Sequence, residues 1–130
     1  AANSERIELP DWALERVREG MCGVVTVGSA KGKGLGADKL GFQVAGKTGS
    51  ADFRPMTSAY LAQLELPPGL KPQMRKHTWF VSFFPAENPT NVLVVYCHDI
   101  GVTSSHSSVY LAAQFLKSPE VQAYMQGAIR

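Results

Sequence analysis

The sequence predicts an α+β fold in which an antiparallel sheet of three main strands, connected as a meander, is packed by N- and C-terminal helices. The strongest evidence is a pair of apolar runs at 77–84 and 91–98, rich in Val, Phe, Tyr and Trp. Between them, Pro85-Ala86-Glu87-Asn88-Pro89-Thr90 is a turn-forming segment, so the two runs are predicted to pair as a hairpin. Helical periodicity near both ends of the chain supplies the second layer.

The N-terminal helix is expected from Pro10 to Val27. Pro10 and Asp11 suit a first turn, and apolar residues then recur on one broad face, which is typical of a helix that covers a core. The Gly- and Lys-rich segment 28–41 that follows is predicted to be a mobile connecting loop.

The third strand is predicted at 42–51, where Gly46 and Gly49 mark a close approach of the backbone to its neighbours. The next stretch, 52–77, holds four prolines and is expected to be irregular apart from one short helix at 58–66.

The C-terminal elements are predicted after a polar loop at 99–106. A helix begins at about Ser107, with Val109, Tyr110, Ala113 and Leu116 on its apolar side. Ser118 then caps a second short helix that ends near Met125.

Composition limits the classes of function. The 130 residues are 45% apolar, enough for the core of one domain, and their formal net charge of +2 gives no field that would attract nucleic acid. No apolar run approaches the roughly 18 residues of a membrane helix. The three histidines lack metal-ligand spacing, so no metal or cofactor is expected. Cys22 and Cys97 are expected to be free buried thiols, although a disulfide remains open.

The two apolar runs are apolar at alternate and at intervening positions, which is typical of a sheet covered on both faces. The terminal helices can cover one face, whereas nothing else in the sequence obviously covers the other. The strand around Val92–Cys97 is further expected to have an open edge.

The stretch Val44-Ala45-Gly46-Lys47-Thr48-Gly49-Ser50-Ala51 concentrates the candidate chemistry. Residues 41–48 match G-x-x-x-x-G-K-[ST], the phosphate-binding P-loop pattern, which needs a strand before the loop and a helix after it. The residues before and after this pattern do not fit a strand and a helix, so nucleotide binding is only a minor alternative. The same stretch holds Lys47-Thr48-Gly49-Ser50, a Lys-Thr-Gly box, which instead requires a strand. In a strand Lys47 and Gly49 lie on one side, Thr48 and Ser50 on the other.

This box and its surroundings resemble the penicillin-binding transpeptidases. Glu19-Gly20-Met21-Cys22-Gly23-Val24-Val25 with Ser29-Ala30 looks like the family's helix and small-residue segment before the Lys box, and 77–89 resembles the strand and turn after it. Together these segments cover most of residues 11–117. The resemblance implies part of a penicillin-binding transpeptidase or serine β-lactamase-like fold. It also implies a peptidoglycan D,D-transpeptidase that uses a serine acyl-enzyme.

The resemblance also implies roles for single residues. Lys47 is the catalytic lysine, assisting proton transfer and electrostatics near the nucleophile. Thr48 and Ser50 bind the substrate carboxylate of a D-Ala-D-Ala stem peptide or a β-lactam, and Gly49 lets that ligand approach the backbone. The Ser50 N–H is an oxyanion donor. Two residues depart from the family: Ser50 stands where Thr is usual, and Ser82 where Gly is usual, which is expected to crowd the neighbouring strand slightly.

The family's nucleophile lies in S-x-x-K and its second box is S-x-N, but no Ser in this sequence has Lys three residues on or Asn two residues on. We therefore expect residues 1–130 to be the C-terminal portion of a transpeptidase domain, inactive alone. Its expected partners are the missing upstream part of its own domain and other cell-wall synthesis proteins. The implied location is extracytoplasmic, with an anchor outside this chain. The alternatives are a non-catalytic penicillin-binding-like module for binding or assembly, and a serine β-lactamase.

Overall fold

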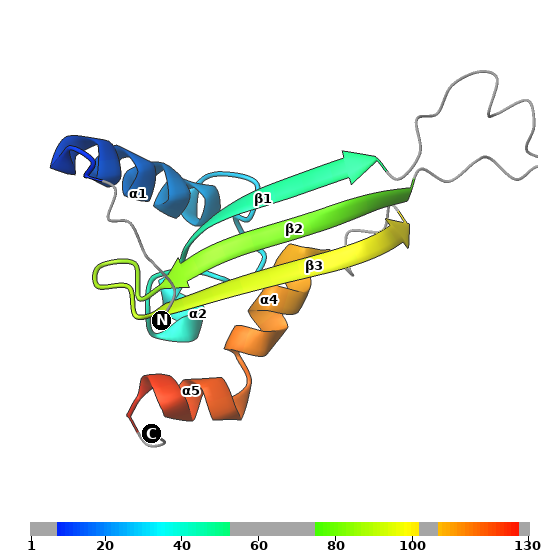
Figure 1. Ribbon diagram of the computed structural model, residues 1–130. Helices are drawn as coiled ribbons and strands as arrows, with labels where there is room; N and C mark the ends of the chain where they lie inside the picture. Colours follow the sequence, from blue (N-terminus) through cyan, green and yellow to red (C-terminus); the bar gives the residue numbers. More distant parts are fainter. Residues whose placement is uncertain (1–7, 53–74, 102–106, 128–130) are drawn as a thin grey trace, which may run out of the picture.

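The computed structural model describes residues 8–52, 75–101 and 107–127. The elements occur in the order α1 (Asp11–Thr26), α2 (Ala37–Leu40), β1 (Ala45–Asp52), β2 (Arg75–Phe84), β3 (Asn91–Gly101), α4 (Ser108–Leu116) and α5 (Pro119–Met125). Figure 1 shows α1 beside β1, with α4 against the sheet. The short helix predicted at 58–66 lies outside the described residues.

The three strands form one antiparallel sheet in the order β1-β2-β3. Lys47 of β1 pairs with Val81 of β2, and Trp79 of β2 pairs with Tyr96 of β3. Paired residues share a face of a sheet, so the register assigns every described strand residue to one face or the other. The predicted α+β class with a three-stranded antiparallel sheet is confirmed.

One face of the sheet is covered and forms the core. Phe80 and Phe84 of β2 pack there with apolar residues of α4 and of the segment before β1; the buried cluster is completed by Val25, Ala30, Leu35, Leu40, Val44, Val109, Ala112, Ala113 and Leu116. The segment 28–41 is therefore not simply a mobile loop. Leu35 and Leu40 are 1% and 2% exposed, and the one-turn helix α2 forms within it. Burial of these two leucines ties the segment to the core.

Helix α1 has the predicted limits to within one residue, but the expectation that its broad apolar face covers the core is wrong. Trp12, Leu14 and Val17 are exposed, whereas Val25 near the end of the helix is buried. Figure 1 shows the reason: the first turns of α1 lie away from the sheet, and only its last turns reach β1.

The C-terminal helices begin where predicted. The side chains of Ser107 and Ser118 accept hydrogen bonds from the backbone N–H groups of Tyr110 and Val121, so both serines are N-caps. Tyr110 is exposed, so the prediction that it lies on the apolar side of this helix is wrong. Strand β3 runs to Gly101, so the start of the predicted loop at 99–106 is part of the strand.

The other face of the sheet is largely exposed among the described residues, as predicted, and only Ala45 of β1 is buried on it. Val81, Val92, Val94 and Tyr96 lie on it with 40%, 73%, 59% and 48% of their surface exposed. Strand β3 lies at one edge of this sheet, with β2 on its other side, so the predicted open edge is confirmed for the described strands. Among the described residues, the sheet thus presents both an apolar face and an open strand edge on β3.

Candidate functional site

Strand β1 carries the Lys-Thr-Gly box along the sheet edge opposite β3. In the described sheet only β2 pairs with β1, so the backbone groups on the other side of the strand face outward. Lys47, Gly49 and Ser50 are exposed, and Thr48 is half-buried. The structure therefore brings the four predicted site residues together on one accessible edge strand.

The Lys47 side chain folds along this strand. Its Nζ donates a hydrogen bond to the Thr48 carbonyl oxygen at 2.6 Å. The N–H and C=O groups of residues two apart in a strand point in the same direction, so the Ser50 N–H is directed like the Thr48 carbonyl that the ammonium contacts. A positive charge and a backbone donor are thereby directed to the same side of β1.

The Thr48 side chain lies on the covered face, in register with Phe80. Its Oγ1 is 2.8 Å from the Ser29 Oγ, and either hydroxyl can be the donor. Ser29 follows α1 and is 19 residues away in sequence. The sequence pointed to Ser29 only as part of a family-like segment, because this spacing has no local signature that would predict the contact.

Close backbone approach is confirmed at Gly46 and not at Gly49. A Cβ on Gly46 would lie 2.6 Å from the Phe80 ring, whereas a Cβ on Gly49 would have its nearest neighbour, Trp79 Cβ, at 3.7 Å. Ser82 pairs with Gly46, which has no side chain, and its buried hydroxyl donates to the Leu93 carbonyl at 3.3 Å. Ser82 thus lies opposite a residue that has no side chain.

An aromatic cluster continues the exposed face beside the Lys box. The Tyr96 hydroxyl lies 3.1 Å from His77 Nδ1 and 2.9 Å from His98 Nδ1, and the Trp79 and Tyr96 ring centroids are 5.0 Å apart. Trp79 is paired with Gly49 of β1. The two histidines therefore belong to an ordered aromatic surface.

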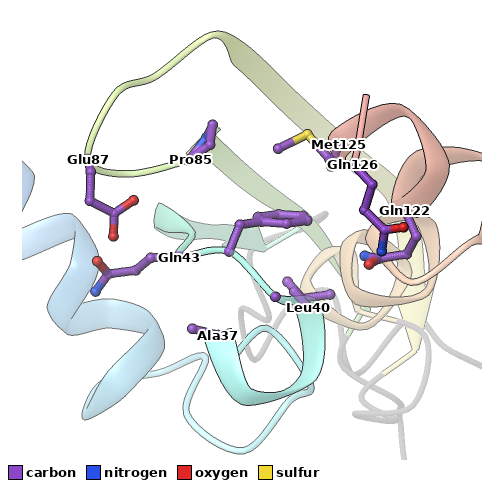
Figure 2. Close-up of a pocket in the computed structure, with 10 residues that line it drawn as sticks. Ala37, Leu40, Gln43, Pro85, Glu87, Gln122, Met125 and Gln126 are labelled. Carbon is purple, nitrogen blue, oxygen red and sulfur yellow. The ribbon is translucent and has the colours of Figure 1, made fainter. Parts of the chain in front are cut away.

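A cavity of about 590 Å³ lies between the α2 region, the turn after β2 and α5. Figure 2 shows Gln43 and Glu87 on one side of it and Gln122 and Met125 on the other. None of the residues from Lys47 to Ser50 lines it. In the part of the chain that the structure describes, no three His, Cys, Asp or Glu residues gather in a way that could hold a metal.

The strand geometry contradicts the P-loop alternative. A P-loop places Lys and the following hydroxyl residue at the start of a helix, so that N–H groups surround the phosphates. Here Lys47 and Thr48 lie inside β1, and the preceding Gly41, with φ of +79°, ends helix α2. Nucleotide binding by this motif is therefore excluded.

Fold and site define an α+β domain whose edge strand presents a lysine, a hydroxyl and outward backbone groups. Residues 4–117 match the family described as penicillin binding protein transpeptidase domain, and the chain belongs to that family. It is 31% identical over 96 residues to the protein named peptidoglycan D,D-transpeptidase MrdA, from Haemophilus influenzae. The aligned part is 74% of this chain and 14% of that protein, so the chain spans a small part of its relative's length. Among the described residues, no helix has the length and apolar character to span a membrane.

Proposed function

We propose that this chain is the C-terminal portion of the transpeptidase domain of a peptidoglycan D,D-transpeptidase, and that β1 forms one wall of its acyl-transfer site. The observation that carries the proposal is the edge strand itself, where the Lys47 ammonium reaches over the Thr48 carbonyl beside exposed Gly49 and Ser50. The Haemophilus influenzae relative, which is named a peptidoglycan D,D-transpeptidase, supports the same reaction class.

The proposed substrate is a stem peptide ending in D-Ala-D-Ala, and β-lactams are its analogues. A serine Oγ attacks the penultimate carbonyl carbon, and the terminal D-Ala departs with a proton on its amine. The acyl-enzyme is then attacked by the amine of a second stem peptide, which releases the serine. Lys47 assists proton transfer and stabilises negative charge near the reacting carbonyl. The Ser50 N–H donates to the oxyanion, and the Thr48 and Ser50 hydroxyls bind the substrate carboxylate.

The nucleophilic serine is proposed to lie in a part of the protein outside this sequence. Two facts support this: no Ser here is followed by Lys at the third position, and the alignment covers 14% of the relative. The bare sheet face is the surface that this remaining part of the domain would cover. Because the substrate is part of peptidoglycan, the site is proposed to work outside the cytoplasm. The anchor, and the contacts with other cell-wall synthesis proteins, are proposed to lie in segments outside this chain.

The test is covalent labelling by a fluorescent penicillin. We expect the full-length native protein to be labelled, and Lys47→Ala to slow labelling by about 100-fold or more, as for loss of a group that stabilises the transition state. Lys39→Ala is the matched control, since Lys39 is an exposed lysine on α2 paired with Asp38. Residues 1–130 alone should form no adduct. Labelling of this chain alone, or a Lys47→Ala protein labelled at the native rate, would contradict the proposal.

Two alternatives from the same fold give different results in this experiment. A non-catalytic binding or assembly module is favoured by the absence of S-x-x-K from these residues, and its full-length form would bind no penicillin covalently. A serine β-lactamase would be acylated and would then hydrolyse the β-lactam with rapid turnover. A stable adduct separates the transpeptidase from both.

A further inference from the structure

The segment that follows α1 is held in one tight conformation. The Gly28 N–H donates to the Gly23 carbonyl at 2.8 Å, and the Ala30 N–H donates to the Val24 carbonyl at 3.0 Å. A Cβ on Gly28 would lie 2.9 Å from Val24 Cα, so the backbone at 28 packs directly on the helix end. Ala30 is 1% exposed. Ser29 therefore stands between two positions that are fixed by hydrogen bonds and packing.

Ser29 uses this position to contact β1. Its Oγ lies 2.8 Å from Thr48 Oγ1, which joins the end of α1 to the centre of the Lys-Thr-Gly box. Threonine is β-branched, and rotation about its χ1 exchanges the directions of the hydroxyl and the methyl group. The hydrogen bond to Ser29 selects the rotamer that directs the Thr48 hydroxyl toward Ser29.

The direction of this hydrogen bond depends on what else Thr48 meets. A hydroxyl has one proton and two lone pairs, so Thr48 can donate to an anion while it accepts from Ser29. A hydrogen bond to a carboxylate is stronger than one between neutral groups, and neighbouring hydrogen bonds polarise each other. With a carboxylate at Thr48, the Ser29 O–H would therefore donate to Thr48 Oγ1, and the Thr48 O–H would donate to the carboxylate.

Lys47 does not provide this orientation. Its side chain belongs to the opposite face of β1, and its Nζ is bound to the Thr48 carbonyl oxygen instead of the Thr48 hydroxyl. From these contacts we propose that Ser29 is a positioning residue that orients and polarises the Thr48 hydroxyl for the carboxylate of the substrate or β-lactam. The inference rests on the proposed function for the identity of that ligand, but the Ser29–Thr48 contact is independent of it.

The kinetic test compares acylation of the full-length protein by benzylpenicillin and by its methyl ester, which lacks the carboxylate. We expect Ser29→Ala to slow acylation by the free acid about tenfold, the size expected for the loss of one hydrogen bond, and to change the ester rate less than about twofold. Ser29→Thr retains the hydroxyl and should stay within about threefold of the native rate. Ser118→Ala, which removes a serine hydroxyl at the cap of α5, is the matched control and should change neither rate.

A double-mutant cycle adds a second readout. If Ser29 acts through Thr48, then Ser29→Ala should add no further loss for the free acid once Thr48 has been changed to Val. Equal losses of Ser29→Ala on acid and ester, or additive losses in the cycle, would overturn the proposal, because a merely structural role predicts both.

A direct measurement separates failure of this inference from failure of the proposed function. Methyl NMR couplings of ¹³C-labelled Thr48 in the full-length protein report its χ1 without any substrate. We expect one rotamer in the native and Ser29→Thr proteins and averaging in Ser29→Ala. Rotamer averaging in the native protein overturns the positioning role even if acylation occurs. A single native rotamer with no acylation retains the Ser29–Thr48 contact and refutes the transpeptidase function.

Discussion

Cys22 and Cys97 are both free thiols, as predicted, but they differ in exposure. Cys97 is buried in β3, whereas Cys22 is half-buried on α1 and lines a cavity of about 270 Å³ together with Arg18 and Glu87. Burial raises the pKa of the Cys22 thiol, Glu87 raises it further, and Arg18 opposes them. Since only the thiolate is an effective nucleophile, the environment of Cys22 suppresses its reactivity.

We therefore predict that iodoacetamide modifies Cys22 more slowly in the folded protein at pH 8 than in urea. The pKa of the Cys22 thiol is higher in the folded protein than in the unfolded chain. The protonated thiol therefore stabilises the folded state fully below the unfolded-state pKa, and this contribution is lost as the pH rises through the folded-state pKa. Mass spectrometry of the alkylated peptide measures the rate. Glu87→Gln should increase it and Arg18→Gln should decrease it. A folded-state rate above the unfolded one would contradict this prediction.

At the scale of the elements, β1 and β2 are matched to each other by shape. Phe80 fills the space that Gly46 leaves, and Ser82 sits opposite the same glycine. A Cβ on Gly49, three residues further along, would make only ordinary van der Waals contact with Trp79. The two glycines of this strand thus have different roles, one in packing and the other in leaving room beside the Lys box.

We predict that Gly46→Ala lowers the free energy of unfolding by about 1–3 kcal/mol, because the new methyl group would overlap the buried Phe80 ring. Gly49→Ala is the matched control and should change stability by less than about 0.5 kcal/mol, since it is exposed and meets no atom closely. Urea denaturation measures both. Equal effects of the two substitutions would show that packing on Phe80 is not the cause.

For the whole molecule, the main feature is a sheet with one covered face and one bare face. The covered face holds the buried cluster around Phe80 and Leu116, and the bare face exposes Val92 and Val94 beside the unpaired edge of β3. Exposed apolar patches and open strand edges both promote association. The arrangement fits a domain in which further segments complete the sheet.

The expected consequence is that residues 1–130 alone self-associate at micromolar concentration. Val94→Lys places a charge on the bare face and should shift the chain toward monomer, as sedimentation velocity can measure. Val27→Lys is the matched control, because Val27 is 76% exposed but lies after α1 and outside the sheet. A native chain that stays monomeric up to about 100 times that concentration would argue against an exposed docking face.

The sequence by itself determined the secondary structure and the chemical class. Alternating and continuous apolar runs, turn residues and serine caps depend on local physics, so the hairpin, α4 and α5 were predicted close to their observed limits. The Lys-Thr-Gly box and its flanking segments pointed to the family, since the order and spacing of those residues are readable along the chain. The open face of the sheet was also predicted, because two strands are apolar on both sides while the terminal helices can cover only one face.

Only the tertiary structure decided which neighbours each residue meets. Periodicity predicted that Trp12 lies on the core-covering face of the first helix, yet it is exposed. The Gly- and Lys-rich composition predicted that Leu35 lies in a mobile loop, yet it is buried. The pairing of Ser29 with Thr48 and the grouping of His77 with His98 join residues separated by 19 and 21 positions. Such contacts depend on how α1 packs on β1 and on the register of the strands, which local propensity does not specify.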